Sequence, residues 1–514
     1  MSKYIGINIG PVVKTLSLAR RPRELWAASY LFSYLMKCIV EEAENKGGLI
    51  APAKVSGESD LKVGLYPDRL YLRPNDQNNN ELAADILKIA WENFRKNVSS
   101  QEYEEPHENK ALRGIWLYDE YFNLMHTSCE ADSEVVAVKT LNRQLDLLEL
   151  CVMASNTTDK YDPQGQVLKL LQRTNNSSLF YLATGKPEFP VESLAEIAAA
   201  QLQTKVSEKW NDFVSLAKSE NDKTNPYSVF ENKHNSYHRY FCVVQSDGDN
   251  MGKTLTDISL ADGSISKISS ALVKFGKKAV TLISEFGGMP IYAGGDDLLF
   301  LAPVVGKDNK HIFELLESLD SDAFCQVRDV CKKVQPSLDS IDLPTLSFGV
   351  SISFYKHPLY EALETARTLL FDVAKNVPGK KAIAWKLEKH SGESFEACYS
   401  RKEKELDDAV KGVINVTDDG QIVTQTLHKS KCNWKLLTMC LESENRFLLD
   451  SFFKTTLEET LQNKAYFDAL KILMRTLFDV KKPSDDEQMK AYVESLYSIL
   501  RTAKFIKGED PKDE

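Results

Sequence analysis

Three neighbouring segments in the second half of the chain carry the clearest hydrophobic patterning. Residues Tyr240–Gln245 form a short run of β-favouring residues, which predicts a strand. Over Ile265–Phe286 the apolar residues recur at helical spacing, which predicts a helix. Within Met289–Pro303, strand-forming residues lie on both sides of a glycine pair. This pattern predicts a β-hairpin whose two-residue turn is formed by Gly294 and Gly295.

The rest of the chain is mainly helical in pattern. A strand at Tyr4–Ile9 precedes a long helix from residue 23 to about residue 45, and residues 166–217 favour helices. Further helices are predicted at 434–442, 457–479 and 488–505. Polar breaks rich in Asn and Pro separate these segments at 75–80, 154–166, 218–238 and 418–433. We therefore expect four domains, at 1–153, 154–235, 236–390 and 391–514.

Composition narrows the class of protein. The 514 residues are too many for one core, and 43% are hydrophobic and 27% charged. The sequence has no run of ~18 apolar residues and no secretory pattern after Met1, so we expect a cytoplasmic protein without membrane contact. Nine cysteines stand singly, without zinc-ligand spacing. The net charge of −10 argues against a protein that mainly wraps nucleic acid.

Acidic residues follow two of the predicted strands. Asp296 and Asp297 stand at the hairpin tip, and Asp247 follows the strand at Tyr240–Gln245. Adjacent carboxylates on a rigid tip suit Mg²⁺ or Mn²⁺. A lone Gly-Gly-Asp-Asp turn is commonly a solvated hairpin. Acids at both places, in the order strand, helix, hairpin, are typical of the palm domains of nucleotide polymerases and cyclases, which hold two metals on a nucleoside triphosphate.

The start of the chain echoes this segment. Two pairs of stretches run in parallel: Gly47–Pro52 with Gly287–Tyr292, and Tyr66–Pro74 with Gly294–Pro303. In the first copy the tip holds one acid, Asp68, beside Arg69, and the strand corresponding to that of Asp247 ends without an acid. We expect two palm domains, the first degenerate, although chance similarity between two strand-turn-strand units is an open alternative.

Four stretches resemble the large subunit of type III CRISPR effector complexes, the Cas ten family, in particular its type III-B Cmr form. They are Ala19–Leu35, Ser246–Lys253, Gly294–Asp297 and Pro344–Leu363. The resemblance covers nearly the whole chain and implies an α+β fold with two ferredoxin-like palm domains of the nucleotidyl cyclase and polymerase type. By this reading 1–153 is the first, degenerate palm, 154–235 a helical linking domain, 236–390 the catalytic palm and 391–514 a helical C-terminal domain.

The resemblance also implies an activity. The second palm would bind ATP and two divalent metals, Mg²⁺ or Mn²⁺, and transfer AMP when the complex captures target RNA. Asp247, Asp296 and Asp297 match the family's metal-binding acids and are the candidate catalytic residues. The expected reaction is attack by a 3′-hydroxyl on the α-phosphate with loss of pyrophosphate. Candidate nucleotide-binding residues are Ser246, Gly248, Gly294, Gly295, Lys375 and Lys380.

The implied partners are other CRISPR effector subunits, among them a small helical subunit against the C-terminal domain, together with guide RNA and target RNA. Many family members begin with a histidine-aspartate nuclease domain. This sequence has no His-Asp dipeptide among its eight histidines and starts in the palm, so we expect no DNase activity. The family's four-cysteine zinc site is also missing from residues 154–235.

Family members without the nuclease domain include enzymes that join AMP from ATP to S-adenosylmethionine. Asp68, with Glu149, would supply negative charge for such a cationic co-substrate. An ordinary helix-surface acid is the competing interpretation of Glu149. We favour S-adenosylmethionine over a second ATP, which would give a cyclic oligoadenylate instead. The alternatives to this class of enzyme are a diguanylate-cyclase-like enzyme, whose tip and strand-end motifs look similar, and a catalytically silent scaffold subunit.

Overall fold

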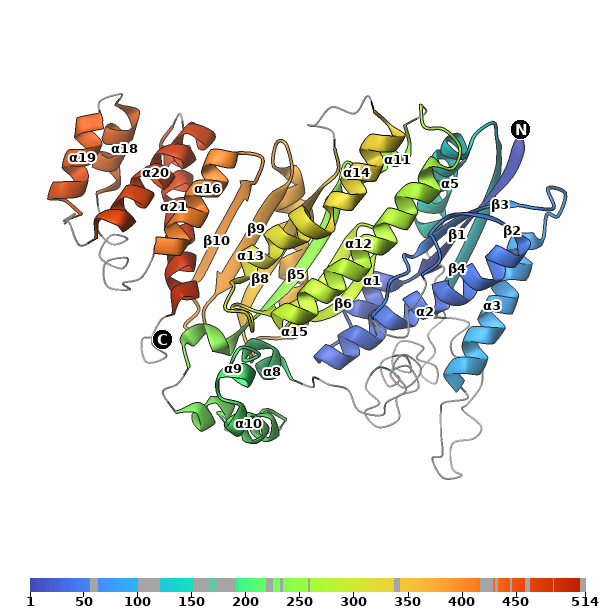
Figure 1. The fold of residues 1–514 in the computed structure, drawn as a ribbon, viewed down its shortest axis with the longest axis horizontal. Coiled ribbons are helices and arrows are strands. Elements are labelled where there is room, and N and C mark those ends of the chain that lie inside the picture. The colour runs from blue at the N-terminus through green and yellow to red at the C-terminus, as the bar shows by residue number, and fades with distance from the viewer. Residues whose placement is uncertain are drawn as a thin grey trace.

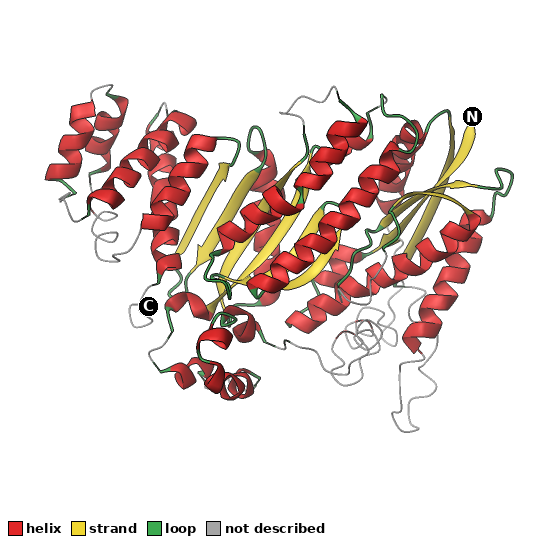
Figure 2. Ribbon diagram, in the orientation of Figure 1, coloured by secondary structure: helices red, strands yellow, loops and turns green. Residues whose placement is uncertain are grey.

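The protein is described by a computed structural model that contains two β-sheets with helices packed on them (Figures 1 and 2). The described residues are 1–55, 63–99, 121–150, 167, 171, 191, 193–218, 225–231, 234–257, 259–336, 343–416, 429, 433–443, 446–457, 463–483 and 485–508. Figure 1 places the sheets side by side along the long axis, with the last helices at the end opposite the N-terminus. The predicted boundary at residues 153 and 154 lies outside the described residues.

The first sheet has the strand order β2-β3-β1-β4. Its strands are β1 (Ser2–Gly10), β2 (Gly47–Ala51), β3 (Arg69–Pro74) and β4 (Asn123–Ala131). The helices of this part are α1 (Val12–Leu16), α2 (Pro22–Lys46), α3 (Leu82–Ser99) and α5 (Glu134–Leu150). The strand at Tyr4–Ile9 and the helix that follows it are therefore confirmed.

The second sheet has the order β10-β9-β8-β5-β7-β6. Its strands are β5 (Tyr240–Asp249), β6 (Met289–Gly294), β7 (Asp297–Pro303), β8 (Thr345–Phe354), β9 (Ala382–Glu388) and β10 (Ser394–Ser400). Its helices are α11 (Met251–Leu255), α12 (Ser264–Phe286), α13 (Ile312–Ser318), α14 (Cys325–Val334) and α15 (Leu359–Thr368). Two π-turns, η6 (Leu319–Ala323) and η7 (Leu369–Val373), continue α13 and α15, and η8 (Ala374–Asn376) follows η7.

The two sheets share one topology, since β2-β3-β1-β4 repeats as β6-β7-β5-β8. In both, the first strand lies between the third and fourth, which is the ferredoxin-like arrangement. The prediction of two ferredoxin-like palm domains in an α+β fold is confirmed. The second palm adds β9, parallel to β8, and β10, antiparallel to β9. Because β10 runs from Ser394 to Ser400, the sheet extends past residue 390, where we placed the boundary.

The segment between the two palms forms short helices that lie beside the second palm (Figure 1). They are α8 (Leu194–Ala198), α9 (Leu202–Lys205), η3 (Ser207–Lys209), α10 (Trp210–Ala217), η4 (Pro226–Phe230) and η5 (Ser236–Arg239). The C-terminal helices are α16 (Lys404–Val416), α18 (Trp434–Glu442), α19 (Arg446–Thr455), α20 (Lys464–Lys481) and α21 (Asp486–Lys507). Buried side chains of α16 and α21 join the core of the second palm. Helical linking and C-terminal parts are therefore present, as predicted.

Helix α2 fixes the first palm against the second. Most of its side chains are buried, because it packs both on its own sheet and on β6 of the second palm. Ser29 Oγ donates to the carbonyl oxygen of Ile291 at 2.9 Å, and Ala293 N donates to the carbonyl of Gly64 at 3.0 Å. Backbone groups of β6 that would otherwise form an open sheet edge thus bond to the first palm. This contact sets how the two hairpin tips face each other.

Two details of the predicted elements were wrong. β5 continues through Asp249 rather than ending at Gln245, because it pairs with β8 as far as Asp249 opposite Thr345. The hairpin turn consists of Gly295 and Asp296, not Gly294 and Gly295, because Gly294 pairs with Asp297 in the ladder. Only Gly295 has the positive φ, +66°, that favours glycine.

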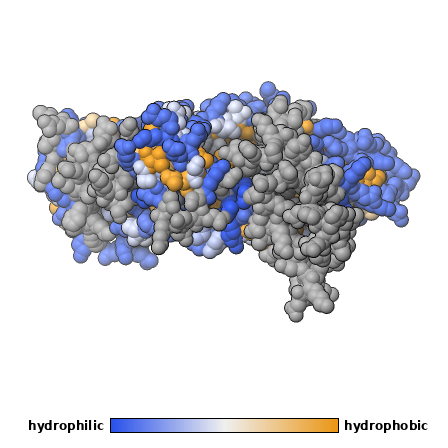
Figure 3. All heavy atoms as spheres, turned by 90° about the horizontal axis from the view of Figure 1, so that it is seen from below, coloured by the Kyte–Doolittle hydropathy of each residue, from blue (hydrophilic) through white to orange (hydrophobic). Residues whose placement is uncertain are grey.

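The face of the molecule seen from below is mostly hydrophilic where it is described (Figure 3). Small apolar clusters interrupt it, and no continuous apolar band crosses the described part of this face. Among the residues that the structure describes, every helix is too short or too polar to cross a membrane.

Gly349 tests the packing of α15 and η7 on the sheet. A Cβ at this position would collide with the Ala366 carbonyl oxygen and lie 2.5 Å from Leu370 N. We expect Gly349→Ala to destabilise the protein by roughly 1–3 kcal/mol, because neither backbone atom can move independently. Calorimetric melting of the full chain measures the change.

Gly412→Ala is the matched control, because Gly412 lies inside α16 and a Cβ there meets nothing within 4 Å. Alanine is a better helix former than glycine, so this variant should melt at or above the temperature of the parent. A melting temperature of Gly349→Ala equal to that of the control would contradict the close packing at β8.

Candidate active site between the two palm domains

Three carboxylates of the second palm meet at the end of β5. The antiparallel pairing of β5 with β7 sets Ser246 opposite Leu298, which places Asp247 opposite Asp297. Asp296 occupies the adjoining turn. The structure therefore brings all three predicted acids together, on strands rather than on a long loop.

Crowding of these acids disfavours their charged forms. Burial, followed by the charge of Asp247, raises the pKa of Asp296 to about 7. Burial also raises the pKa of Asp297, with further contributions from Asp296 and Asp247. Solvent still reaches both side chains at the surface of the cleft. A donor set of three hard oxygen ligands that repel one another fits a divalent cation, which would lower this repulsion.

The acids do not form a finished metal cage. Among the described residues, no three His, Cys, Asp or Glu side chains are gathered closely enough to hold a metal ion without help. Mg²⁺ in nucleotide enzymes is commonly held by one or two carboxylates together with substrate phosphates. The arrangement therefore suits metal ions that arrive with a nucleotide.

Glycines allow the acids to approach the backbone. A Cβ on Gly248 would lie 2.5 Å from Asp296 Oδ2 and 2.7 Å from Met251 Cγ. The missing side chain is thus required for the position of Asp296, and a backbone hydrogen bond from Gly248 offsets part of the rise that burial and Asp247 cause in the pKa of Asp296. A Cβ on Gly294 would overlap the Tyr292 ring, and Gly295 provides the positive φ of the turn. All three glycines therefore shape the tip.

Lys375 lies at the acids, a contact that was not predicted. Its ammonium forms an ion pair with Asp247, donates to the Asp247 carbonyl at 2.9 Å and pairs with Asp249 Oδ1 at 2.9 Å. Although burial works against its charged form, Asp247 and Asp249 raise the pKa of Lys375. An ammonium has three donors, and all three are used here. Lys375 thus contacts the acids themselves, and its contact with a triphosphate stays a prediction.

Ser246 and Lys380 are two other residues that we predicted to bind the nucleotide. Ser246 is fully buried in the sheet, so its hydroxyl does not reach the cleft, and the predicted approach to phosphates is wrong for this structure. Lys380 has a positive φ of 56°, and its carbonyl accepts a hydrogen bond from Ser400 Oγ at 2.6 Å. A role of its ammonium at the triphosphate stays a prediction.

The hairpin tip of the first palm has the same strand register as the tip of the second palm but carries different side chains. In the pairing of β1 with β3, Asn8 lies opposite Arg69, as Asp247 lies opposite Asp297 in the second palm. Where the second palm has two acids, the first palm thus has an amide and a base. Asp68 takes the place of Asp296, and its charge contributes to the raised pKa of Asp297. The two tips therefore face each other across one cleft.

Glu149 belongs to this second tip. Its carboxylate accepts hydrogen bonds from Asn8 Nδ2 at 2.5 Å and from Arg69 Nη2 at 2.8 Å, and Arg69 also pairs with Asp146 at 2.7 Å. Glu149 is thus a partner of the tip residues rather than an isolated acid on the helix surface. We expected Asp68 and Glu149 to supply negative charge together, and Arg69 neutralises part of that charge.

A cavity of about 190 Å³ opens between the palms at this point. Its walls include Pro67, Arg69 and Tyr71 from the first palm, and Leu272, Gly295 and Asp296 from the second. Most of the lining is apolar, with charged groups at the two tips, which is usual for small-molecule sites.

Sequence reasoning missed the residues that hold this arrangement in place. Asp249 is fully buried and accepts hydrogen bonds from Thr345 Oγ1 at 2.8 Å and from Ser347 Oγ at 2.8 Å. The i, i+2 spacing of Asp247 and Asp249 on a strand places both on one face, which was a usable signal. Arg69 offered no such signal, because its partner Glu149 is 80 residues away.

Comparisons with known proteins agree with this geometry. Residues 240–384 match the family model described as Cas10/Cmr2, second palm domain, and residues 4–99 match the one described as CRISPR-associated protein Cmr2, N-terminal. A relative, the CRISPR system Cmr subunit Cmr2 of Pyrococcus furiosus, is 32% identical over 184 residues. The match covers 30% of this chain and 19% of that relative, so most of the relative's length is unmatched.

Two solved structures share the fold. A type III-B Cmr-beta chain in the apo state has a TM-score of 0.55 and 11% identity, over 90% of this chain and 78% of the other. A type III-B Cmr-beta chain bound to cognate target RNA has a TM-score of 0.55 and 13% identity, over 88% and 78%. At such identities the likeness concerns the fold.

Gly248→Ala tests whether the acids form one metal site. The added methyl group would displace Asp296, so we expect Mn²⁺ binding to weaken about tenfold, as is typical when a ligand's support is altered. Electron paramagnetic resonance of Mn²⁺ with the full chain measures the affinity. Gly252→Ala is the control, because a Cβ there meets nothing within 4 Å. Equal Mn²⁺ affinity of the two variants would contradict the site.

Proposed function

Because this chain belongs to the Cas10/Cmr2 family through its N-terminal region and its second palm, we propose that it is the nucleotidyltransferase subunit of a type III CRISPR antiviral complex. The observation that carries the proposal is the convergence of Asp247, Asp296 and Asp297 at one strand end. Their mutual repulsion calls for divalent cations, and the adjoining cavity has room for substrate groups.

In this proposal the three acids hold Mg²⁺ or Mn²⁺ together with the phosphates of ATP. The bound metals would lower the pKa of the attacking hydroxyl and neutralise the leaving pyrophosphate. Gly248 leaves room for the Asp296 carboxylate beside β5, and Gly295 supplies the positive φ of the turn that presents Asp296 to the phosphates. Lys375 balances the charge of Asp247 before the nucleotide arrives.

The chemical step is a nucleotidyl transfer. The 3′-oxygen of the acceptor forms a bond to the α-phosphorus of ATP, and the bond from that phosphorus to the bridging oxygen breaks. Pyrophosphate carries away the electron pair, and the hydroxyl proton passes to solvent. The facing tips hold the donor and acceptor close together, which contributes to the rate by orientation.

We propose S-adenosylmethionine as the acceptor. Asp68, Asp146 and Glu149 with Arg69 give the first tip three acids against one base, an environment that favours a cationic ligand. A second ATP, which would lead to a cyclic oligoadenylate, brings phosphates that these acids repel. The product is then AMP joined to S-adenosylmethionine, acting as a nucleotide second messenger.

The partners follow from the family. A chain of similar fold belongs to a type III-B Cmr-beta complex bound to cognate target RNA. We infer that this chain likewise works with other effector subunits, a guide RNA and a target RNA, and that target capture activates the transfer. Domain boundaries at 153 and 235 remain our proposal, and the third moves from 390 to the end of β10 at Ser400.

The double variant Asp296→Asn, Asp297→Asn tests the activity. Loss of two metal-binding charges should lower ATP consumption by the assembled complex at least about 100-fold. Release of pyrophosphate is the measurement. Glu285→Gln, an exposed acid near the end of α12, is the control and should match the parent. Unchanged turnover in the double variant would favour a silent scaffold subunit.

Nucleotide choice separates the proposal from a diguanylate cyclase. Labelled ATP and labelled GTP are supplied separately to the complex with target RNA and Mg²⁺ or Mn²⁺. We expect product from ATP, as the resemblance to the Cas ten family implies. Turnover of GTP alone would overturn the assignment.

Mass spectrometry of products made from ATP with and without S-adenosylmethionine identifies the acceptor. We expect an AMP conjugate when both are present, and about a tenfold loss of this product in Glu149→Gln, since one unit of charge at the tip is removed. Glu285→Gln, the exposed acid of α12, is again the control and should give as much of this product as the parent. A cyclic oligoadenylate in both conditions would instead identify ATP as the acceptor.

A further inference from the structure

A row of charged residues, some of them buried, leads away from the candidate metal acids. Asp249 is fully buried, and besides Lys375 it binds the backbone N–H of Lys381 at 3.0 Å. The Lys381 ammonium lies 3.4 Å from Asp320 Oδ2. Lys381 therefore links the two buried acids, Asp249 through its backbone and Asp320 through its side chain.

Asp320 continues the row towards the C-terminal helices. Its carboxylate is 4% exposed and lies 3.0 Å from Arg328 and 3.6 Å from Arg401. Although burial favours the neutral acid, Arg401, Arg328 and Lys381 lower the pKa of Asp320. Asp320 belongs to the π-turn η6, and such turns are frequent at functional positions.

Arg401 ends the row at the joint between sheet and helices. It lies one residue after β10 and three before α16, and its side chain is 4% exposed. Its Nη2 donates to the carbonyl of Leu346 at 2.8 Å. Leu346 stands on β8 between Thr345 and Ser347, which both bond to Asp249. Arg401 thus reaches Asp249 by two routes, through Asp320 and through β8.

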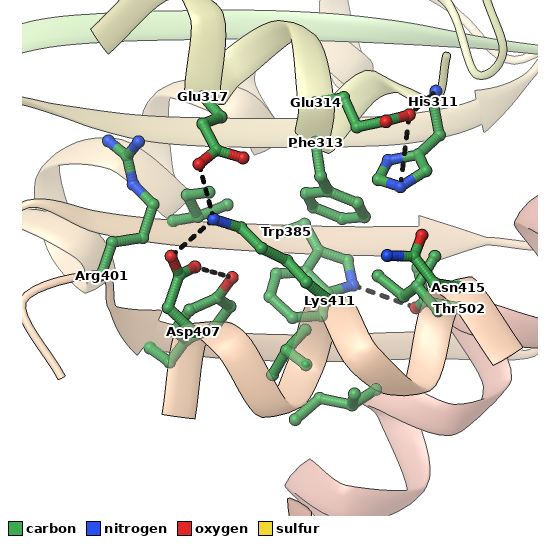
Figure 4. Close-up of a pocket in the computed structure, with 15 residues that line it drawn as sticks. His311, Phe313, Glu314, Glu317, Trp385, Arg401, Asp407, Lys411, Asn415 and Thr502 are labelled. Atoms are coloured by element: carbon green, nitrogen blue, oxygen red, sulfur yellow. Dashed lines mark hydrogen bonds and ion pairs between the residues drawn. The ribbon is translucent and has the colours of Figure 1, made fainter. Parts of the chain in front are cut away.

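The joint itself is incompletely packed. A cavity of about 120 Å³ separates α13 and the β9–β10 strands from α16 and α21, and Arg401 lies at one end of it (Figure 4). Beside it, Lys411 of α16 pairs with Glu317 at 2.7 Å and with Asp407 at 2.8 Å. The cavity leaves the packing between α16 and the sheet incomplete on this side, and polar contacts such as Lys411 with Glu317 cross it.

A purely structural account of the row is weak. Buried ion pairs seldom stabilise a fold more than apolar residues of the same size would, because each charge must be removed from water. Their best-attested use is to fix one arrangement or to couple two sites. Here the row connects an incompletely packed joint to a metal-binding acid, and both of its ends are at functional positions.

We propose that Arg401, Asp320 and Lys381 are positioning residues that hold Asp247 ready for metal through Asp249 and Lys375. With the row intact, Asp249 shares the Lys375 ammonium with Asp247. Arg401 contacts Asp320 and also donates its backbone N–H to the Lys381 carbonyl at 2.9 Å, so a shift of α16 that moves Arg401 disturbs Lys381 and loosens the hold of Asp249 on Lys375. Lys375 then occupies Asp247 more fully, and metal binds less well. The C-terminal helices therefore control the site, an inference that rests on the proposed function.

The test compares Arg401→Gln with Arg501→Gln in the full chain. Arg501 also joins β10 to the C-terminal helices, through Glu393 at 3.2 Å, but it is not part of the row. Mn²⁺ is titrated by electron paramagnetic resonance with a non-hydrolysable ATP analogue, and melting temperatures are recorded. We expect roughly five- to tenfold weaker Mn²⁺ binding in Arg401→Gln only.

Two further variants exclude a general loss of structure. Arg401→Lys keeps the charge and should recover at least part of the affinity, whereas Asp320→Asn should weaken Mn²⁺ binding like Arg401→Gln. In turnover assays the metal requirement should rise while the KM for ATP stays near that of the parent.

Parent-like Mn²⁺ affinity in Arg401→Gln, or an equal loss in Arg501→Gln, would overturn the inference while leaving the proposed function intact. A parent chain that binds no Mn²⁺ would overturn both.

Discussion

Repulsion among Asp247, Asp296 and Asp297 is the constraint on which the rest of the site depends. Three carboxylates at one strand end are tolerated only when nearby cations and donors offset their charge. Lys375 supplies the cation, and Asp249, held by two hydroxyl groups of β8, fixes the position of Lys375. The elements after β8 thus serve the acids of β5, although more than 100 residues separate them in sequence.

The two palms illustrate how one backbone register supports two chemistries. Asn8 and Arg69 stand opposite each other just as Asp247 and Asp297 do. The helical partner changes sign as well, since Glu149 serves the first tip where Lys375 serves the second. At matching backbone positions the second tip thus carries clustered acids, whereas the first tip carries mixed charge.

Much of the fold was predictable, because apolar spacing and glycine position decide strands, helices and the hairpin. The repeated topology followed from the same signals. The turn was misplaced because two adjacent glycines allow two registers, and only the ladder selects Gly295 with Asp296. The contacts of Lys375 with Asp247 and Asp249 were not predicted, for a different reason. A lysine after a helix shows nothing in sequence of the buried Asp249 that holds it, since that contact spans 126 residues.

The unequal tips also give the cleft a polarity. In a pair of identical palms, either tip would serve as donor or acceptor, and a bound pair of substrates would have two equivalent orientations. Here Asn8 and Arg69 remove that equivalence, so each half of the cleft is reserved for one reactant. Under the proposed function, phosphodiester bonds then form in a single direction. The amide and the base at the first tip would in this sense make the synthesis directional.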